Sequence, residues 1–202
     1  MNKKPFWRRV NRGLVVSIVL LCILFIYVVT TQVMLMLEKR EITGLVNDVR
    51  ELMESTTVLS DKQVESLKSE SSLLAEQNRI KGELSKIFVK DSKYFENAVS
   101  NFTDNIKQQT EGIQRVTQRD DGRKVDDSIS IVQDKAHAYY QYLYNINGEY
   151  SEVTSEKIIK VEDAEQMLYL DISFKKVNGE WKIYSIVNAS WSSIDQRIRR
   201  DG

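Results

Sequence analysis

Residues 166–191 read QMLYLDISFKKVNGEWKIYSIVNASW, and this stretch decides the fold. Its centre, Asn178-Gly179, is the strongest short signal for a β-hairpin, because both residues tolerate a positive φ. A two-residue loop there pairs Val177 with Glu180. A slip of one residue would mix the two faces of the hairpin, so the pattern supports both the turn and the register. With Val177 opposite Glu180, one face of the hairpin becomes almost wholly apolar. The opposed pairs on this face are Phe174 and Ile183, Ile172 and Ser185, Leu170 and Val187, and Leu168 and Ala189.

The rest of the predicted sheet follows from this hairpin. An earlier strand is expected over residues 157–162, with Ile159 and Val161 facing inward. A hairpin alone is marginally stable in water, so helices must cover its apolar face. We therefore predict an α+β fold, with helices packed on a curved antiparallel sheet. The other face of the hairpin is expected to meet solvent or a partner and carries Tyr169, Asp171, Ser173, Tyr184, Ile186 and Asn188.

Residues 128–147 fit two structures. Their tyrosines alternate as in a strand, and tyrosine favours strands. We favour a helix, because Asp126, Asp127 and Ser128 offer caps. Asn147-Gly148 suits either a helix end or a hairpin turn, and residues 118–127 are predicted to form a polar loop centred on Gly122. The helical stripe is formed by Ile129, Val132, Ala136, Tyr140 and Leu143.

Helices are predicted upstream of the sheet. The first has an apolar stripe at three- and four-residue spacing: Ile42, Leu45, Val49 and Leu52. Ser60 and Gln63 match a capping box, so another helix is expected to begin there. Asp91 or Ser92 is expected to cap a further helix. Its apolar face would contain Phe95, Val99, Phe102, Ile106, Ile113 and Val116.

A short heptad-like seam lies between these helices. It covers about two heptads, fewer than a coiled coil needs. Packing on the protein's own domain and self-association both remain open. The seam is formed by Leu73, Gln77, Ile80, Leu84 and Ile87.

Together with the apolar run near the N-terminus, these patterns divide the chain into five parts. We expect a cytoplasmic tail (1–13), a membrane helix (14–37), a helical stalk (38–90), an α+β domain (91–195) and a basic tail (196–202).

Residues 14–37 contain no charged residue. Such a run makes a helix of about 36 Å, which is enough to cross a hydrocarbon core of about 30 Å. A cleaved signal peptide would have a shorter apolar run followed by small residues, whereas no alanine precedes Ala75 here. We therefore expect an uncleaved anchor. Its lipid-facing residues are expected to include Leu14, Leu20, Leu24, Phe25 and Leu37.

The charge distribution predicts the orientation. Basic residues alone precede the apolar run: Lys3, Lys4, Arg8, Arg9 and Arg12. Positive flanks stay in the cytoplasm, so we expect a single-pass protein of the cell membrane with residues 38–202 outside. This outer part holds all 29 acidic residues and 24 of the 29 basic ones, a net charge of −5. An acidic domain argues against direct binding of nucleic acid.

No motif for catalysis stands out. The chain has one Cys and one His, no phosphate-binding loop and no serine nucleophile elbow. The adjacent acidic pairs Asp120-Asp121, Asp126-Asp127 and Glu162-Asp163 do not have the spacing of a calcium-binding loop, and His137 is expected to be structural. We predict no catalytic residue, no metal and no cofactor. Because tyrosine is enriched at protein interfaces, the candidate interface residues are Tyr140, Tyr142, Tyr144, Tyr169 and Tyr184.

Two stretches, AHAYYQYLYNINGEYSEV (136–153) and LYLDISFKKVNGEWKIYSIVNASW (168–191), resemble the nuclear-transport-factor-two-like fold. With a basic tail and one anchor, the chain is similar to the eighth VirB protein of type IV secretion systems and its Gram-positive conjugation relatives. The resemblance implies a non-enzymatic scaffold of a channel that moves DNA or protein across the cell envelope. It implies other channel proteins as partners, with a homo-oligomer as a further option.

Two alternatives remain open. The same fold often has a cone-shaped cavity, so the domain could bind a ligand or act as an enzyme, with Tyr140, His137 and Tyr169 lining the cavity. The second alternative is a division or envelope protein whose residues 41–118 form a true coiled coil.

Overall fold

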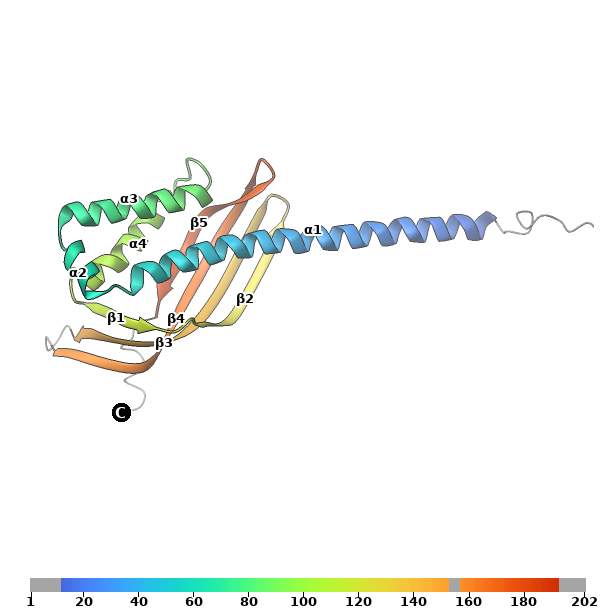
Figure 1. Cartoon of the computed structure of the whole chain (residues 1–202). Coiled ribbons are helices and arrows are strands. Elements are labelled where there is room, and N and C mark those ends of the chain that lie inside the picture. Colours follow the sequence, from blue (N-terminus) through green and yellow to red (C-terminus); the bar gives the residue numbers. More distant parts are fainter. Residues whose placement is uncertain (1–11, 153–156, 193–202) are drawn as a thin grey trace, which may run out of the picture. The chain divides into compact units, whose positions relative to one another are not determined.

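The structure is a computed structural model that describes residues 12–152 and 157–192 (Figure 1). The chain divides into two compact units, with the boundary between Glu41 and Ile42. The first unit holds the apolar part of helix α1 (Arg12–Thr57), and the second holds the rest of α1, further helices and an antiparallel sheet. The α+β class is confirmed. Lys3, Lys4, Arg8, Arg9 and the basic tail lie outside the described residues, as does the side chain of Arg12.

The first part of α1 has the length and apolar composition to cross a membrane. Its two threonine hydroxyls are satisfied within the helix, since Thr30 Oγ1 donates to the carbonyl of Ile26 at 2.9 Å and Thr31 Oγ1 to that of Tyr27 at 2.8 Å. Backbone acceptors of this kind make hydroxyls tolerable in lipid. The five predicted anchor residues all have exposed side chains: Leu14, Leu20, Leu24, Phe25 and Leu37.

Three shorter helices follow in the second unit: α2 (Asp61–Leu67), α3 (Glu70–Ile87) and α4 (Phe95–Thr110). The capping box at α2 is confirmed, because Ser60 Oγ accepts from the backbone of Gln63, and Gln63 Oε1 accepts from the backbone of Ser60 at 2.9 Å. Ser69 caps α3 in the same way by accepting from the N–H of Ser72.

The expected start and end of α4 were wrong. Its N-cap is Tyr94, without a side-chain cap, while Asp91 has a φ of 60° and the Ser92 hydroxyl donates to the carbonyl of Tyr184. The helix ends at Thr110, so Ile113 and Val116 do not continue its apolar face. Val116 is instead buried in the first strand.

The sheet contains β1 (Gln114–Arg119), β2 (Arg123–Val132), β3 (Lys135–Glu152), β4 (Lys157–Val177) and β5 (Glu180–Trp191). All pairs are antiparallel. β1 and β2 both pair with the same edge of β3. β4 pairs with the other edge of β3, and β5 pairs with β4. The polar loop between β1 and β2 is shorter than predicted and centres on residues 120–122, where Gly122 has a φ of 66°.

The helix predicted over residues 128–147 was wrong, because these residues form parts of β2 and β3. The alternation of a strand is the pattern present, since the even-numbered side chains from Ala136 to Ile146 face the core. Asn147 and Gly148 lie within β3 and form neither a helix end nor a turn. A Cβ on Gly148 would collide with the carbonyl oxygen of Arg115, so β1 approaches β3 closely there.

The hairpin at Asn178-Gly179 is confirmed, with Val177 opposite Glu180 and Phe174 opposite Ile183. Beyond those pairs the predicted register was wrong. Two bulges in β5 move Ile172 opposite Ile186, Leu170 opposite Ala189 and Leu168 opposite Trp191. Val187, expected to face inward, is consequently 65% exposed. The strand predicted over 157–162 is the beginning of β4, with Val161 buried, while the side chain of Ile159 is not described.

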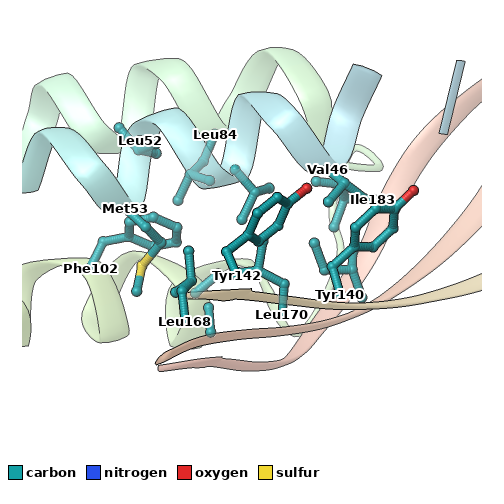
Figure 2. Packing of buried hydrophobic residues seen from close by; sticks show 14 of the residues in the cluster. Val46, Leu52, Met53, Leu84, Phe102, Tyr140, Tyr142, Leu168, Leu170 and Ile183 are labelled. Carbon is teal, nitrogen blue, oxygen red and sulfur yellow. The ribbon is translucent and has the colours of Figure 1, made fainter. Parts of the chain in front are cut away.

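The helices cover one face of the sheet and close a single hydrophobic core (Figure 2). Residues predicted to form a stalk contribute to this core, since Val46 and Val49 of α1 and Ile80 and Leu84 of α3 are fully buried. Because Ile80 and Leu84 belong to the heptad-like seam, that seam packs on the protein's own domain. The sheet contributes Tyr140, Tyr142, Leu168, Leu170, Phe174, Trp181 and Ile183.

Candidate functional site

The candidate interface tyrosines do not form one surface. Tyr140, Tyr142 and Tyr144 point from β3 into the core, where each is at most 4% exposed. Tyr169 lies on the opposite face of the sheet, across from Gln141. Tyr184 is 37% exposed and packs edge-on against Tyr94, with ring centroids 5.5 Å apart.

The inward tyrosines are held by polar groups of α1. The Tyr144 hydroxyl donates to Glu54 Oε1 at 2.5 Å, and Arg50 Nε lies 3.5 Å from the same oxygen. The Tyr140 hydroxyl lies 3.1 Å from Thr43 Oγ1, and the Arg50 guanidinium lies 4.9 Å from the centre of the Tyr142 ring. Burial raises the pKa of Tyr144, and its hydrogen bond to Glu54 raises it further. Burial also raises the pKa of Tyr142.

Arg119 of β1 completes this buried group. Its Nη2 donates to the carbonyl of Glu54 at 2.9 Å, and its guanidinium lies 5.1 Å from the Tyr144 ring and 4.5 Å from the Trp191 ring. Burial lowers the pKa of Arg119, an effect that the Glu54 carboxylate opposes. The arrangement ties the end of α1 to β1, β3 and β5. Because Arg50 pairs with Glu54, and both guanidinium groups lie over aromatic rings, we interpret the group as structural.

The residues proposed to line a catalytic cavity do not come together. Tyr140 faces the core, whereas His137 and Tyr169 lie on the other face of the sheet. His137 Nε2 lies 2.7 Å from Asp171 Oδ1 on that outer face. Leu168, Leu170 and Phe102 fill the space between the helices and the sheet (Figure 2). In the described residues, no group of three His, Cys, Asp or Glu side chains could hold a metal ion.

A groove lies between α4 and the last part of β5, and we call it the β5 groove. Its volume is about 310 Å³. One wall is a polar stripe at helical spacing on α4, and the other is the strand itself. Asp104 is the charged member of the lining. The groove is lined by Thr57, Asn101, Asp104, Asn105, Gln108, Gln109 and residues 187–191.

Sequence reasoning did not find this groove. The spacing of Asn101, Asp104, Asn105 and Gln108 was visible, but a polar stripe on a helix is usually a solvated face. The second wall depended on the bulges of β5, which expose Val187. Arg50, Glu54 and Arg119 were missed as well, because nothing in their spacing shows that they converge on Tyr144.

No family model matches the chain, and no curated protein matches it. A solved structure to which it is similar is that of Aln2 from a Streptomyces species, with 9% sequence identity and a TM-score of 0.33. The match covers 71% of this chain and 99% of that chain. A TM-score of this size does not establish a shared fold.

Proposed function

We propose that this protein is a non-enzymatic scaffold subunit of a type IV secretion or conjugative DNA-transfer channel. Its apolar helix anchors it in the cell membrane, with the N-terminus in the cytoplasm and residues 38–202 outside. The outer domain adopts a nuclear-transport-factor-two-like fold and assembles with other channel proteins. It does not contact the nucleic acid directly.

One observation carries this proposal: an exposed apolar helix leads into a domain whose interior is filled and whose polar groove lies on its surface. A filled interior suits a protein that works through its surface. The helices on one face of a long antiparallel meander support the fold assignment. The basic residues that precede the apolar run in the sequence support the orientation.

The alternatives receive less support. A ligand-binding or enzymatic cone needs an open interior with converging polar groups, and the interior near Tyr140 is instead packed by Leu168, Leu170 and Val46. A coiled-coil division protein needs the α3 seam to face a partner, and Ile80 and Leu84 are buried against the domain itself.

A deletion strain tests the role. We expect conjugative transfer to fall by orders of magnitude and to recover with the wild-type chain supplied in trans. Transfer at wild-type frequency would refute the scaffold function. Mild cross-linking in native membranes, read by mass spectrometry, should recover transfer ATPases and other channel proteins. Recovery of division proteins instead would favour the coiled-coil alternative.

The orientation has its own test. Single cysteines at Val132 and at Leu74, both exposed in the outer domain, should react in intact cells with a thiol reagent that cannot cross the membrane. The Cys22→Ser background removes the native thiol. Labelling only after lysis would place the domain in the cytoplasm and contradict the proposal.

A further inference from the structure

The two edges of the sheet are protected to different degrees. Unpaired strand edges are templates for pairing with another chain, and proteins block them with charges, bulges or covering segments. On one side, β1 is bridged by Val58 at Val116. β2, on the same side, carries four charged residues in ten: Arg123, Lys124, Asp126 and Asp127.

The first half of β5 is also protected. The N–H of Val89 donates to the carbonyl of Ile183 at 2.8 Å, and the Ser92 hydroxyl donates to the carbonyl of Tyr184 at 2.7 Å. Glu180 and Lys182 add charges to the same half. The segment between α3 and α4 thus covers this end of the edge.

The second half of β5, residues 185–191, carries no charged side chain, and no segment of the described residues is hydrogen-bonded to its outer edge in the way that Val89 and Ser92 are to the first half. Its sequence, SIVNASW, contains no charge and no proline. Within the described part of the chain, β4 is its only strand partner, so alternate backbone groups face away from the sheet. Val187 presents a side chain that is 65% exposed. The bulge at Val187 interrupts this half at one position, and at its other positions no strand of the described residues pairs with the outer edge.

The β5 groove runs along this unprotected half. The polar stripe on α4 extends from Asn101 to Gln108, which is about 10 Å of helix and matches about three residues of an extended chain. A groove between an edge strand and a helix suits a peptide that adds to the edge and is recognised through alternate side chains.

The charge of the groove indicates the chemistry of its ligand. Asp104 is the charged side chain in the lining, and its nearest cation, Lys107 Nζ, lies 3.9 Å away. The two side chains are 54% and 49% exposed, so this ion pair is weak and a cation from a ligand can replace Lys107. The amides of Asn105 and Gln108 offer both donors and acceptors beside the carboxylate.

We propose that the second half of β5 binds an extended, basic segment of a partner protein, which adds to the sheet as an edge strand and places a Lys or Arg beside Asp104. This inference rests on the proposed function in one respect only, because it treats the outer domain as a module that binds other proteins. Its test with synthetic peptides does not require a transfer channel.

The test measures fluorescence anisotropy of labelled peptides with the full-length protein in detergent micelles. The probes are TVKVTVKVT, its glutamate version TVEVTVEVT and a proline version, TVKPTPKVT, which cannot form the strand hydrogen bonds. We expect the lysine peptide to bind at least tenfold more tightly than either of the others. Equal binding of all three peptides, or no binding of the lysine peptide, would overturn the proposal.

Three variants locate the site. Asp104→Lys should reverse the preference between the lysine and glutamate peptides. Val187→Lys should weaken binding of the lysine peptide at least tenfold, because lysine on an edge opposes strand addition. Val132→Lys is the matched control, since Val132 is 66% exposed on β2, and it should leave binding unchanged. Retained binding in Val187→Lys would contradict the assigned site.

Two further outcomes are informative. Dimers of the wild-type protein that disappear in Val187→Lys would mean that a second copy occupies the edge, and the proposal of a basic partner segment would fail. If the peptides bind as expected while a deletion strain transfers DNA normally, the groove stands and the channel role fails. The two proposals can therefore fail separately.

Discussion

The Tyr144 hydroxyl donates a 2.5 Å hydrogen bond to Glu54 Oε1, joining the centre of β3 to the last turns of α1. Arg50 Nε lies 3.5 Å from the same carboxylate oxygen, and the Arg119 guanidinium lies 5.1 Å from the centre of the Tyr144 ring, so two cations surround the bond while the phenol remains neutral. This contact links segments far apart in the sequence and fixes how the last turns of α1 lie on the sheet.

Removing this hydroxyl should destabilise the protein. Tyr144→Phe deletes a hydrogen bond to a charged acceptor, which is worth about 1.5–3 kcal/mol. We expect the free energy of unfolding, measured by denaturant titration of the full-length chain in micelles, to fall by that amount. Tyr184→Phe is the control, because its ring is partly exposed, and should change stability by less than about 0.5 kcal/mol. Equal effects of the two substitutions would contradict the role of Glu54.

The same hydroxyl predicts a loss of stability at alkaline pH. The pKa of Tyr144 is raised in the folded state, whereas in the unfolded chain it has its ordinary value of about 10. Its contribution is therefore complete below about pH 10 and is lost as the pH rises from there towards the folded pKa, because the unfolded chain releases the proton first. Stability between about pH 9 and 11 should decline less steeply in Tyr144→Phe than in the wild type.

Two glycines with similar backbones should respond differently to alanine. Gly122 and Gly179 have φ values of 66° and 87°, so alanine at either position costs about 1–2 kcal/mol of backbone strain. A Cβ on Gly122 would also collide with the buried ring of Tyr144, whereas the space around Gly179 is open. Thermal unfolding should show Gly122→Ala to be the less stable variant by a further 1–3 kcal/mol or so.

The heptad-like seam in α3 should contribute to the stability of the folded domain and not to self-association. Leu84→Ala should lower the free energy of unfolding by about 2–5 kcal/mol, because Leu84 is fully buried. Leu74→Ala in the same helix is the control, with a side chain 55% exposed. Light scattering should find the same oligomeric state in both variants and the wild type. A change of oligomeric state in Leu84→Ala without loss of stability would restore the coiled-coil interpretation.

Removing the N-terminal cap of α2 should lower the free energy of unfolding by a smaller amount. Ser60→Ala removes the side-chain half of the capping box and should cost about 0.5–2 kcal/mol. Ser100→Ala, at an exposed position inside α4, should be neutral or slightly stabilising, since alanine is the better helix former. Chemical denaturation of both variants distinguishes the cap from a general effect of losing a serine.

Local patterns in the sequence predicted much of this fold. The Asn178-Gly179 turn, the capping box at Ser60 and the apolar stripes of α1 and α4 each depend on a few neighbouring residues. The error over residues 128–147 arose because Ala136 and Tyr140 fit both a helical stripe and a strand. Leu143 completed the helical stripe, although it is buried on the outer face of the sheet.

What could not be predicted depends on contacts between distant segments. The bulges in β5 do not follow from alternation, because Ser185, Ile186 and Val187 allow several registers. The covering of Ile183 by Val89, and the convergence of Glu54 and Arg119 on Tyr144, join residues that are far apart in the chain. The β5 groove is a product of both effects, and the sequence therefore did not reveal it.

The order of the elements has a consequence for synthesis. The helices α1, α3 and α4 precede the sheet, so they leave the ribosome before the strands that cover their apolar faces. Val46 and Leu84 find Leu168, Leu170 and Ile183 only when β4 and β5 have been made. Until then the nascent chain exposes apolar helix faces, a state prone to aggregation. A chain that ends before β4 therefore cannot close the core, and its apolar helix faces stay exposed.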